Sequence, residues 1–178
     1  MTIYLTADMH FGHSGVIELS HRPFSNIQEM DRLITYNWNN TVSKRDTVYV
    51  LGDVWLKGER NAADYVQKLN GKKYLIKGNH DSKALKNNEF VKLFEDIQDI
   101  METIIDGERV IMCHYPMGEW NGYFRGAWHA HGHIHNNRTG VFEYLLTQER
   151  ALNAGVDING FRPVTFKELK ENNKIWKL

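Results

Sequence analysis

Four short apolar runs, each ending abruptly in a polar residue, constrain the fold of this chain more than any other feature. They cover residues 3–7, 48–52, 74–78 and 110–113. Runs this short and rich in β-branched and aromatic residues are typical of buried strands that are apolar on both faces. Such strands belong to sheets that other layers cover on both sides. The chain is therefore expected to build an α/β core.

Helix-like segments separate the first three runs. A capping-box pattern at residues 25–28 opens the first of these segments, in which apolar residues then recur at helical spacing. A second helix is predicted over residues 60–69, with Gly71 available to end it. Because strands alternate with helices here, this half predicts βαβ units and a largely parallel sheet.

The second half of the chain has a different pattern. Asp106-Gly107 between two apolar stretches predicts a tight hairpin, since a type I′ turn needs positive φ at both central residues. Residues 144–156 are interpreted as further strand, and a capping box at 165–168 predicts a short C-terminal helix. This half is therefore expected to be mixed or antiparallel, which indicates an α/β sandwich rather than a doubly wound sheet.

Length and composition limit the class of protein. The 178 residues suffice for a single domain spanning 1–178, and the 25% of charged residues is typical of a globular chain. A net charge of zero argues against binding to long nucleic acid or to an anionic membrane. Cys113 is the single cysteine, so no internal disulfide can form, and no apolar run approaches the length of a membrane span. We expect a cytoplasmic protein.

The residues that follow the apolar runs are good metal ligands. In open α/β sheets, functional sites form beyond the carboxyl ends of the strands. This sequence places oxygen and nitrogen ligands there, and a further histidine row, HAHGHIH, occupies 129–135. Such ligands suit Mn²⁺, Fe, Zn²⁺ or Ni²⁺. A single aspartate after a strand is usually a helix cap or a turn residue, and a histidine row is often an exposed polar edge. The combination is what indicates a metal site.

As a set, these residues resemble the calcineurin-like metallophosphoesterases, and within them a small single-domain bacterial and phage subgroup. Five motifs occur in the family's order: Asp8-Met9-His10, Gly52-Asp53, Gly78-Asn79-His80-Asp81, His114 and Gly132-His133-Ile134-His135. The family fold implies two packed mixed β-sheets flanked by helices.

The resemblance also implies a role for each matching residue. The first metal ion would be held by Asp8, His10 and His135. The second would be held by Asn79, His114 and His133. Asp53 would bridge the two ions, metal-activated hydroxide would attack phosphorus, and His80 would give a proton to the leaving oxygen.

The chain departs from the family pattern beside the bridging residue. Many members carry a second aspartate shortly after it, which orients the proton donor, but residues 54–58 contain no carboxylate. Asp81 is the expected substitute. The same stretch lacks the Asp-Arg-Gly of serine/threonine protein phosphatases, and Asp81 stands where those enzymes carry Glu, so a protein phosphatase is disfavoured.

Substrate contacts are predicted on weaker grounds. His13, just beyond the first motif, could meet the phosphate or be a surface histidine. The aromatic, glycine-punctuated segment 115–128 could form a pocket wall, in which Trp120, Tyr123 and Arg125 would stack on a base or hold phosphate; alternatively, its rings pack the loop onto the core. Arg22 is a still weaker phosphate candidate.

The sequence thus predicts a binuclear-metal phosphoesterase, with Mn²⁺ favoured, acting on a small phosphomono- or phosphodiester, with a nucleotide-like compound favoured. One alternative is a non-catalytic, metal-binding protein-interaction module of the same fold, although such modules usually have broken ligand positions. Another is a metal-dependent nuclease. An amidohydrolase barrel needs about 250 residues. A metallo-β-lactamase-like site needs an Asp-His pair that does not follow His133-Ile134-His135.

Overall fold

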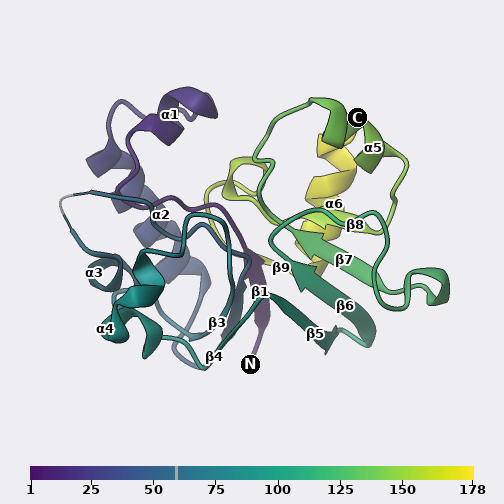
Figure 1. Ribbon diagram of the computed structural model, residues 1–178, viewed down its shortest axis with the longest axis horizontal. Helices are drawn as coiled ribbons and strands as arrows, with labels where there is room; N and C mark the ends of the chain where they lie inside the picture. Colours follow the sequence, from purple (N-terminus) through teal and green to yellow (C-terminus); the bar gives the residue numbers. More distant parts are fainter. Residues whose placement is uncertain (59) are drawn as a thin grey trace.

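A computed structural model describes residues 1–58 and 60–178 and arranges them as two β-sheets packed face to face (Figure 1). The first sheet has the strand order β4-β3-β2-β1-β9 and the second the order β5-β6-β7-β8. The strands of the first sheet are β1 (Ile3–Thr6), β2 (Thr47–Val50), β3 (Lys72–Ile76), β4 (Asp96–Gln98) and β9 (Val164–Thr165). Those of the second are β5 (Ile100–Ile105), β6 (Glu108–Cys113), β7 (Trp128–His131) and β8 (Ala151–Asn153). The predicted fold class is confirmed.

Both sheets are mixed. Strands β1 to β4 pair in parallel, and β9 runs antiparallel to β1. In the second sheet β6, β7 and β8 are parallel, and β5 forms an antiparallel hairpin with β6. The hairpin turns at Asp106-Gly107, where both residues have positive φ, as the sequence predicted. In each sheet the carboxyl ends of the parallel strands therefore share one edge.

Helices cover the outer faces of the sandwich. On the side of the first sheet lie α1 (Gly15–Leu19), α2 (Ile27–Thr41), α3 (Ala62–Val66) and α4 (Asn88–Val91), and on the side of the second lie α5 (Gly140–Leu146) and α6 (Phe166–Trp176) (Figure 1). Short 3₁₀ turns occupy Ala84–Lys86, Tyr123–Arg125 and Val156–Ile158. No helix in the described parts of the chain has the length and apolar character to cross a membrane.

Three apolar clusters hold these layers together. One fills the space between the sheets, where Leu5 of β1 and Ile76 of β3 lie in the same apolar cluster as Met112 of β6 and Leu152 of β8. A second joins the first sheet to α2 and α3, with Trp38 completely buried. The third lies beneath α5 and the end of α6. Burial of this kind supplies most of the free energy of folding, at about 25 cal/mol per Å² of apolar surface.

Some predicted boundaries were wrong. Asn26, not Ser25, caps α2, because its side chain accepts from the Glu29 amide. The helix predicted over 60–69 is confined to Ala62–Val66, with its own capping box at Asn61. Residues predicted as strand from 144 onward instead finish α5, and only Ala151–Asn153 are extended. Packing of α5 onto the second sheet overrides the local β preference there.

Candidate metal centre

The predicted ligands lie at the shared edge where the parallel strands end. β1 and β2 are paired in register to Thr6 and Val50, so the segments that follow them run side by side. The Asp8 amide then donates to Gly52 O at 3.0 Å, and the His10 amide donates to Asp53 O at 3.0 Å. The strand pairing by itself brings the first two motifs into contact.

Five of the seven predicted ligands have left-handed backbone, with φ between 52° and 73°. They are Asp8, His10, Asp53, His133 and His135. This conformation costs a non-glycine residue roughly 1–3 kcal/mol and tends to cluster at functional sites. Here it turns the chain sharply after each strand, so that side chains two residues apart point to one place. The histidine row is accordingly not one continuous strand, because β7 ends at His131.

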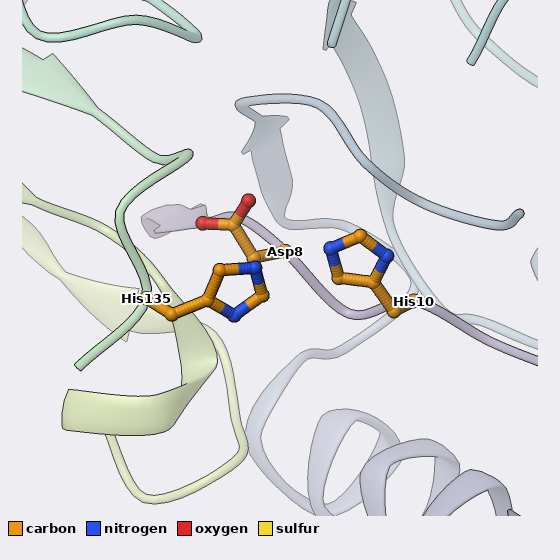
Figure 2. A group of neighbouring side chains, drawn as sticks. All are labelled: Asp8, His10 and His135. Carbon is orange, nitrogen blue, oxygen red and sulfur yellow. The ribbon is translucent and has the colours of Figure 1, made fainter. Parts of the chain in front are cut away.

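One ligand group consists of Asp8, His10 and His135, whose ligand atoms all lie within 4.8 Å of one another. In Figure 2 the His135 ring lies on the left and the His10 ring on the right, with the Asp8 side chain between and above them. The rings of His10 and His135 are stacked, with centroids 5.0 Å apart. His10 is 2% exposed, and no residue that the structure describes forms a hydrogen bond with either of its ring nitrogens. Since buried polar atoms are normally paired, these nitrogens fit a metal ion.

A second ligand group shares Asp8 with the first and adds Asp53. Asp8, Asp53 and His114 also have ligand atoms within 4.8 Å of one another. One carboxylate oxygen of Asp53, Oδ2, lies 3.6 Å from Nε2 of His10 and 3.5 Å from Nε2 of His114, so this residue stands between the groups. Asp8 belongs to both groups as well, whereas the sequence analysis assigned the bridge to Asp53 alone.

Asn79 and His133 complete the second group. The side-chain oxygen of Asn79 lies 3.0 Å from Nε2 of His114 and 3.1 Å from Nδ1 of His133. All seven predicted ligands therefore form one continuous cluster of oxygen and nitrogen donors, to which five separate segments of the chain contribute.

The electrostatics of this cluster favour a cation. Burial raises the pKa of Asp8 to about 6. Burial, together with the neighbouring His135 and Arg22, lowers the pKa of His10 far below its usual value. Burial, with His114 nearby, also lowers the pKa of His133. Neutral imidazoles such as those of His10 and His133, beside buried carboxylates, are donors that divalent transition metals prefer.

His80 and His13 lie at the open side of the cluster. Nε2 of His80 is 3.9 Å from Oδ2 of Asp53, and its side chain is 36% exposed. Its ring centroid is 5.3 Å from that of His10, and the ring of His13 is 5.4 Å from His10. Both predicted residues thus reach the cluster, and His80 lies near the Asp53 carboxylate while remaining accessible to solvent.

Asp81 contacts backbone amides and not the His80 imidazole that it was expected to orient. Its buried carboxylate accepts from the backbone amides of Gly78, Asp53 and Val54 at 2.8–3.0 Å. Among the described residues, no hydrogen bond joins it to the His80 imidazole. Asp81 therefore fixes the backbone that presents Asp53, and the prediction that it orients the proton donor directly was wrong.

The predicted pocket wall is largely turned into the protein. Trp120 is 7% exposed, donates from Nε1 to Ala127 O at 2.9 Å and packs with the residues beneath α5. The Tyr123 hydroxyl donates to Gln148, and Arg125 is exposed in the same 3₁₀ turn. In the described chain no contact joins these three residues to a predicted ligand. The packing alternative is the correct one for Trp120 and Tyr123.

The other two histidines of the row, His129 and His131, contact backbone groups next to the ligand cluster. His129 is buried, and its ring nitrogens contact Ile111 O and the amide of Met117, which ties the 115–128 segment to β6. His131 is also buried, and its Nδ1 contacts Gly132 O at 2.9 Å. Neither ring is part of the two ligand groups.

Sequence reasoning missed Tyr115 and Asp157. The Tyr115 ring lies 4.7 Å from His133 and 5.0 Å from His114, and 45% of the residue is exposed. Asp157 contacts the far side of His135 at 2.9 Å. Arg22, a weak phosphate candidate, is instead buried against Asp157. Tyr115 stands directly after a ligand in the chain, and this position is the one signal that could have identified it.

Two glycines allow the strand ends to approach this closely. A Cβ on Gly78 would lie 2.3 Å from Oδ1 of Asp53, and one on Gly132 would lie 2.7 Å from Oδ2 of Asp8. Real Cβ atoms do not reach such distances without displacing their neighbours. Both positions therefore require glycine for the ligands to keep their places.

The sequence and the fold are similar to those of known proteins. The family model of calcineurin-like phosphoesterases matches residues 1–171. An uncharacterised protein of Methanocaldococcus jannaschii is 33% identical over 165 residues, which cover 92% of this chain and 86% of that protein. The gene 66 protein of Mycobacterium phage L5 is 26% identical over 160 residues, covering 75% and 77% of the two chains. The crystal structure of a protein of unknown function from Aquifex aeolicus matches with a TM-score of 0.75 at 26% identity, covering 95% and 97%.

Proposed function

The chain belongs to the calcineurin-like phosphoesterase family and is a phosphoric ester hydrolase, and we propose that it uses two divalent metal ions to hydrolyse a small phosphomono- or phosphodiester. The observation that carries this proposal is the single cluster formed by the seven candidate ligands, in which, within the described part of the chain, both ring nitrogens of His10 are buried without a hydrogen-bond partner. Such unpartnered nitrogens support a bound metal ion, since each would otherwise cost about 1–3 kcal/mol.

The proposed ligand sets follow the two groups of donors. Asp8, His10 and His135 would hold one ion. Asn79, His114 and His133 would hold the other, with Asp53 shared between them. When bound, two such cations lower the pKa of a water molecule and offset the negative charge that develops on the phosphoryl oxygens.

The side chains at the open face handle the proton and the phosphate. His80 would donate a proton to the leaving oxygen, a role that imidazole fills near neutral pH. Its 36% exposure lets it recover that proton from solvent, and its contact with Asp53 fixes it beside the reacting group. His13, on the same side, would donate a hydrogen bond to a phosphoryl oxygen.

The proposed substrate is nucleotide-like. The half-exposed Tyr115 ring beside His133 supports this choice, because aromatic platforms stack on planar bases. It replaces Trp120 and Tyr123 as the proposed base contact. The zero net charge supports a small substrate over long nucleic acid. We also propose that residues 1–178 form one domain and act in the cytoplasm, which the single cysteine supports.

The test is metal-dependent hydrolysis. The protein is stripped with chelator and reloaded with Mn²⁺, and the hydrolysis of bis(p-nitrophenyl) phosphate is compared with that of the monoester, with Asp53→Asn in parallel. We expect turnover that needs the metal and is lost in the variant, because the shared anion between two cations is gone. Near-normal activity of Asp53→Asn would refute the binuclear assignment. Bound metal without hydrolysis of either ester would favour a non-catalytic module, and cleavage of oligonucleotides alone would favour a nuclease.

A further inference from the structure

A buried ion pair lies directly behind the group of Asp8, His10 and His135. Arg22 donates from Nε and Nη2 to the two carboxylate oxygens of Asp157, at 2.8 and 2.9 Å. The two side chains are 0% and 1% exposed. A buried ion pair is weak evidence for a stabilising role, because desolvation opposes the attraction. The contacts that this pair makes with the ligand group point to another role.

Asp157 controls the orientation of His135. One of its carboxylate oxygens lies 2.9 Å from Nδ1 of His135. A carboxylate accepts hydrogen bonds, so this contact holds the ring proton on Nδ1 and leaves the lone pair of Nε2 free. Figure 2 shows this ring facing His10 and Asp8, so its free nitrogen can serve the same ion.

Arg22 holds the backbone of the other two ligands. Its Nη2 donates to the carbonyl of Asp8 at 2.6 Å, and its Nη1 donates to the carbonyl of Met9 at 3.0 Å. Asp8 and His10, on either side of Met9, both have left-handed backbone, with φ of 58° and 53°. A guanidinium is a rigid fork with five donors, so one side chain can fix this turn and the Asp157 carboxylate together.

We propose that Arg22 and Asp157 are positioning residues that set the geometry of the Asp8, His10 and His135 site and leave the Asn79, His114 and His133 site unaffected. This inference rests on the proposed function. It follows from the contacts: the pair touches His135 and the turn from Asp8 to His10, and no contact in the described chain joins it to the second set. One ion pair thus connects ligands 125 positions apart in the chain.

The experiment combines metal titration with NMR. Asp157→Asn keeps the volume but loses the charge, and Arg22→Lys keeps the charge but loses the fork. Asp46→Asn is the matched control, because Asp46 is a buried carboxylate that accepts from Thr2 and Ser43 before β2, at the opposite edge of the sheet. Mn²⁺ binding is measured by calorimetry, and the ring nitrogens of His135 are observed in metal-free protein at increasing pH until the ring is neutral.

We expect two Mn²⁺ sites in the wild type and in Asp46→Asn. In Asp157→Asn one site should weaken about 10–100-fold, the usual effect of losing such a support, while the other stays within about twofold. Arg22→Lys should weaken the same site by less. Metal-free wild-type protein should carry the His135 proton on Nδ1.

Two results would overturn the proposal. One is an Asp157→Asn protein in which each of the two sites binds Mn²⁺ as tightly as the same site in the wild type. The other is a proton on Nε2 of His135, with Nδ1 accepting from Arg22 Nη2, which lies 3.5 Å away. If Asp157→Asn does not fold, Arg22→Lys decides the binding test. If the wild type binds Mn²⁺ but hydrolyses no phosphate ester, the proposed function fails while the NMR and binding results still judge the positioning pair.

Discussion

Replacing Asp8 by asparagine should stabilise the metal-free protein near neutral pH. The carboxylate is completely buried, and burial raises its pKa from 3.8 to about 6. The native protein therefore holds the proton at a higher pH than the unfolded chain does. Asp8 favours folding below its unfolded pKa, and this contribution is lost as the pH rises through about 6. A shift of about two pKa units corresponds to roughly 3 kcal/mol.

Asparagine mimics the neutral carboxyl, and its side-chain oxygen can still accept from the His133 amide, which donates to Asp8 at 2.9 Å. The difference in unfolding free energy between Asp8→Asn and wild type reports the burial of Asp8 together with its charge interaction with His135, because the buried histidines themselves are common to both proteins. Of the roughly 3 kcal/mol by which Asp8→Asn should finally be more stable, about 1.4 kcal/mol should be gained as the pH rises from 5 to 8.

The assay is urea unfolding in EDTA near pH 5 and near pH 8. Asp46→Asn should instead be less stable than wild type by a similar amount at both pH values, because the Thr2 amide and other donors hold the pKa of Asp46 below its usual value and the carboxylate is ionised throughout this range. With Mn²⁺ at 100 times its dissociation constant, wild type should gain roughly 2.7 kcal/mol that Asp8→Asn does not. An Asp8→Asn protein that is no more stable than wild type at pH 8 in EDTA, or a difference independent of pH, would refute the reasoning.

Three further substitutions test the proposed proton donor, the close approach of Gly132 to Asp8 and the proposed base contact. His80→Ala should keep its metal content and slow esters with poor leaving groups far more than esters with good ones, and equal losses on both would exclude a proton donor. Gly132→Ala should lose metal affinity and roughly 1–3 kcal/mol of stability, because its Cβ would meet Asp8. Gly140→Ala, with nothing within 4 Å of its Cβ, is the control in urea unfolding. Tyr115→Ala should raise KM for nucleotide esters roughly 3–10-fold with little change in kcat; an unchanged KM would remove the stacking role.

Much of this architecture could be predicted from the sequence because its signals are local. The apolar runs identified β1, β2, β3 and β6, and the turn residues Asp106-Gly107 identified the hairpin. The polar residues at the ends of the apolar runs indicated a single site, since parallel strands end at a common edge, and the resemblance to the family implied the role of each residue. The capping box at Thr165 and Glu168 located the start of α6. Each of these features depends on a few neighbouring residues.

The errors occurred where distant segments compete for one side chain. Asp81 follows a ligand and a candidate proton donor in the chain, but three backbone amides surround its carboxylate once the first sheet forms. Trp120 and Tyr123 stood in a segment that suggested a pocket wall, yet the apolar layer under α5 buries the tryptophan. Local sequence cannot show which neighbour a side chain finds.

The sequence by itself determined the donors and the strand ends that carry them. Only the tertiary structure decided which side chains support them: Arg22 and Asp157 lie 135 residues apart and match no ligand motif, yet they meet behind His135. The physical reason is that ligand chemistry is fixed by residue type and short spacing. Support is fixed by burial, because a charge removed from water must find its partner wherever the fold places one.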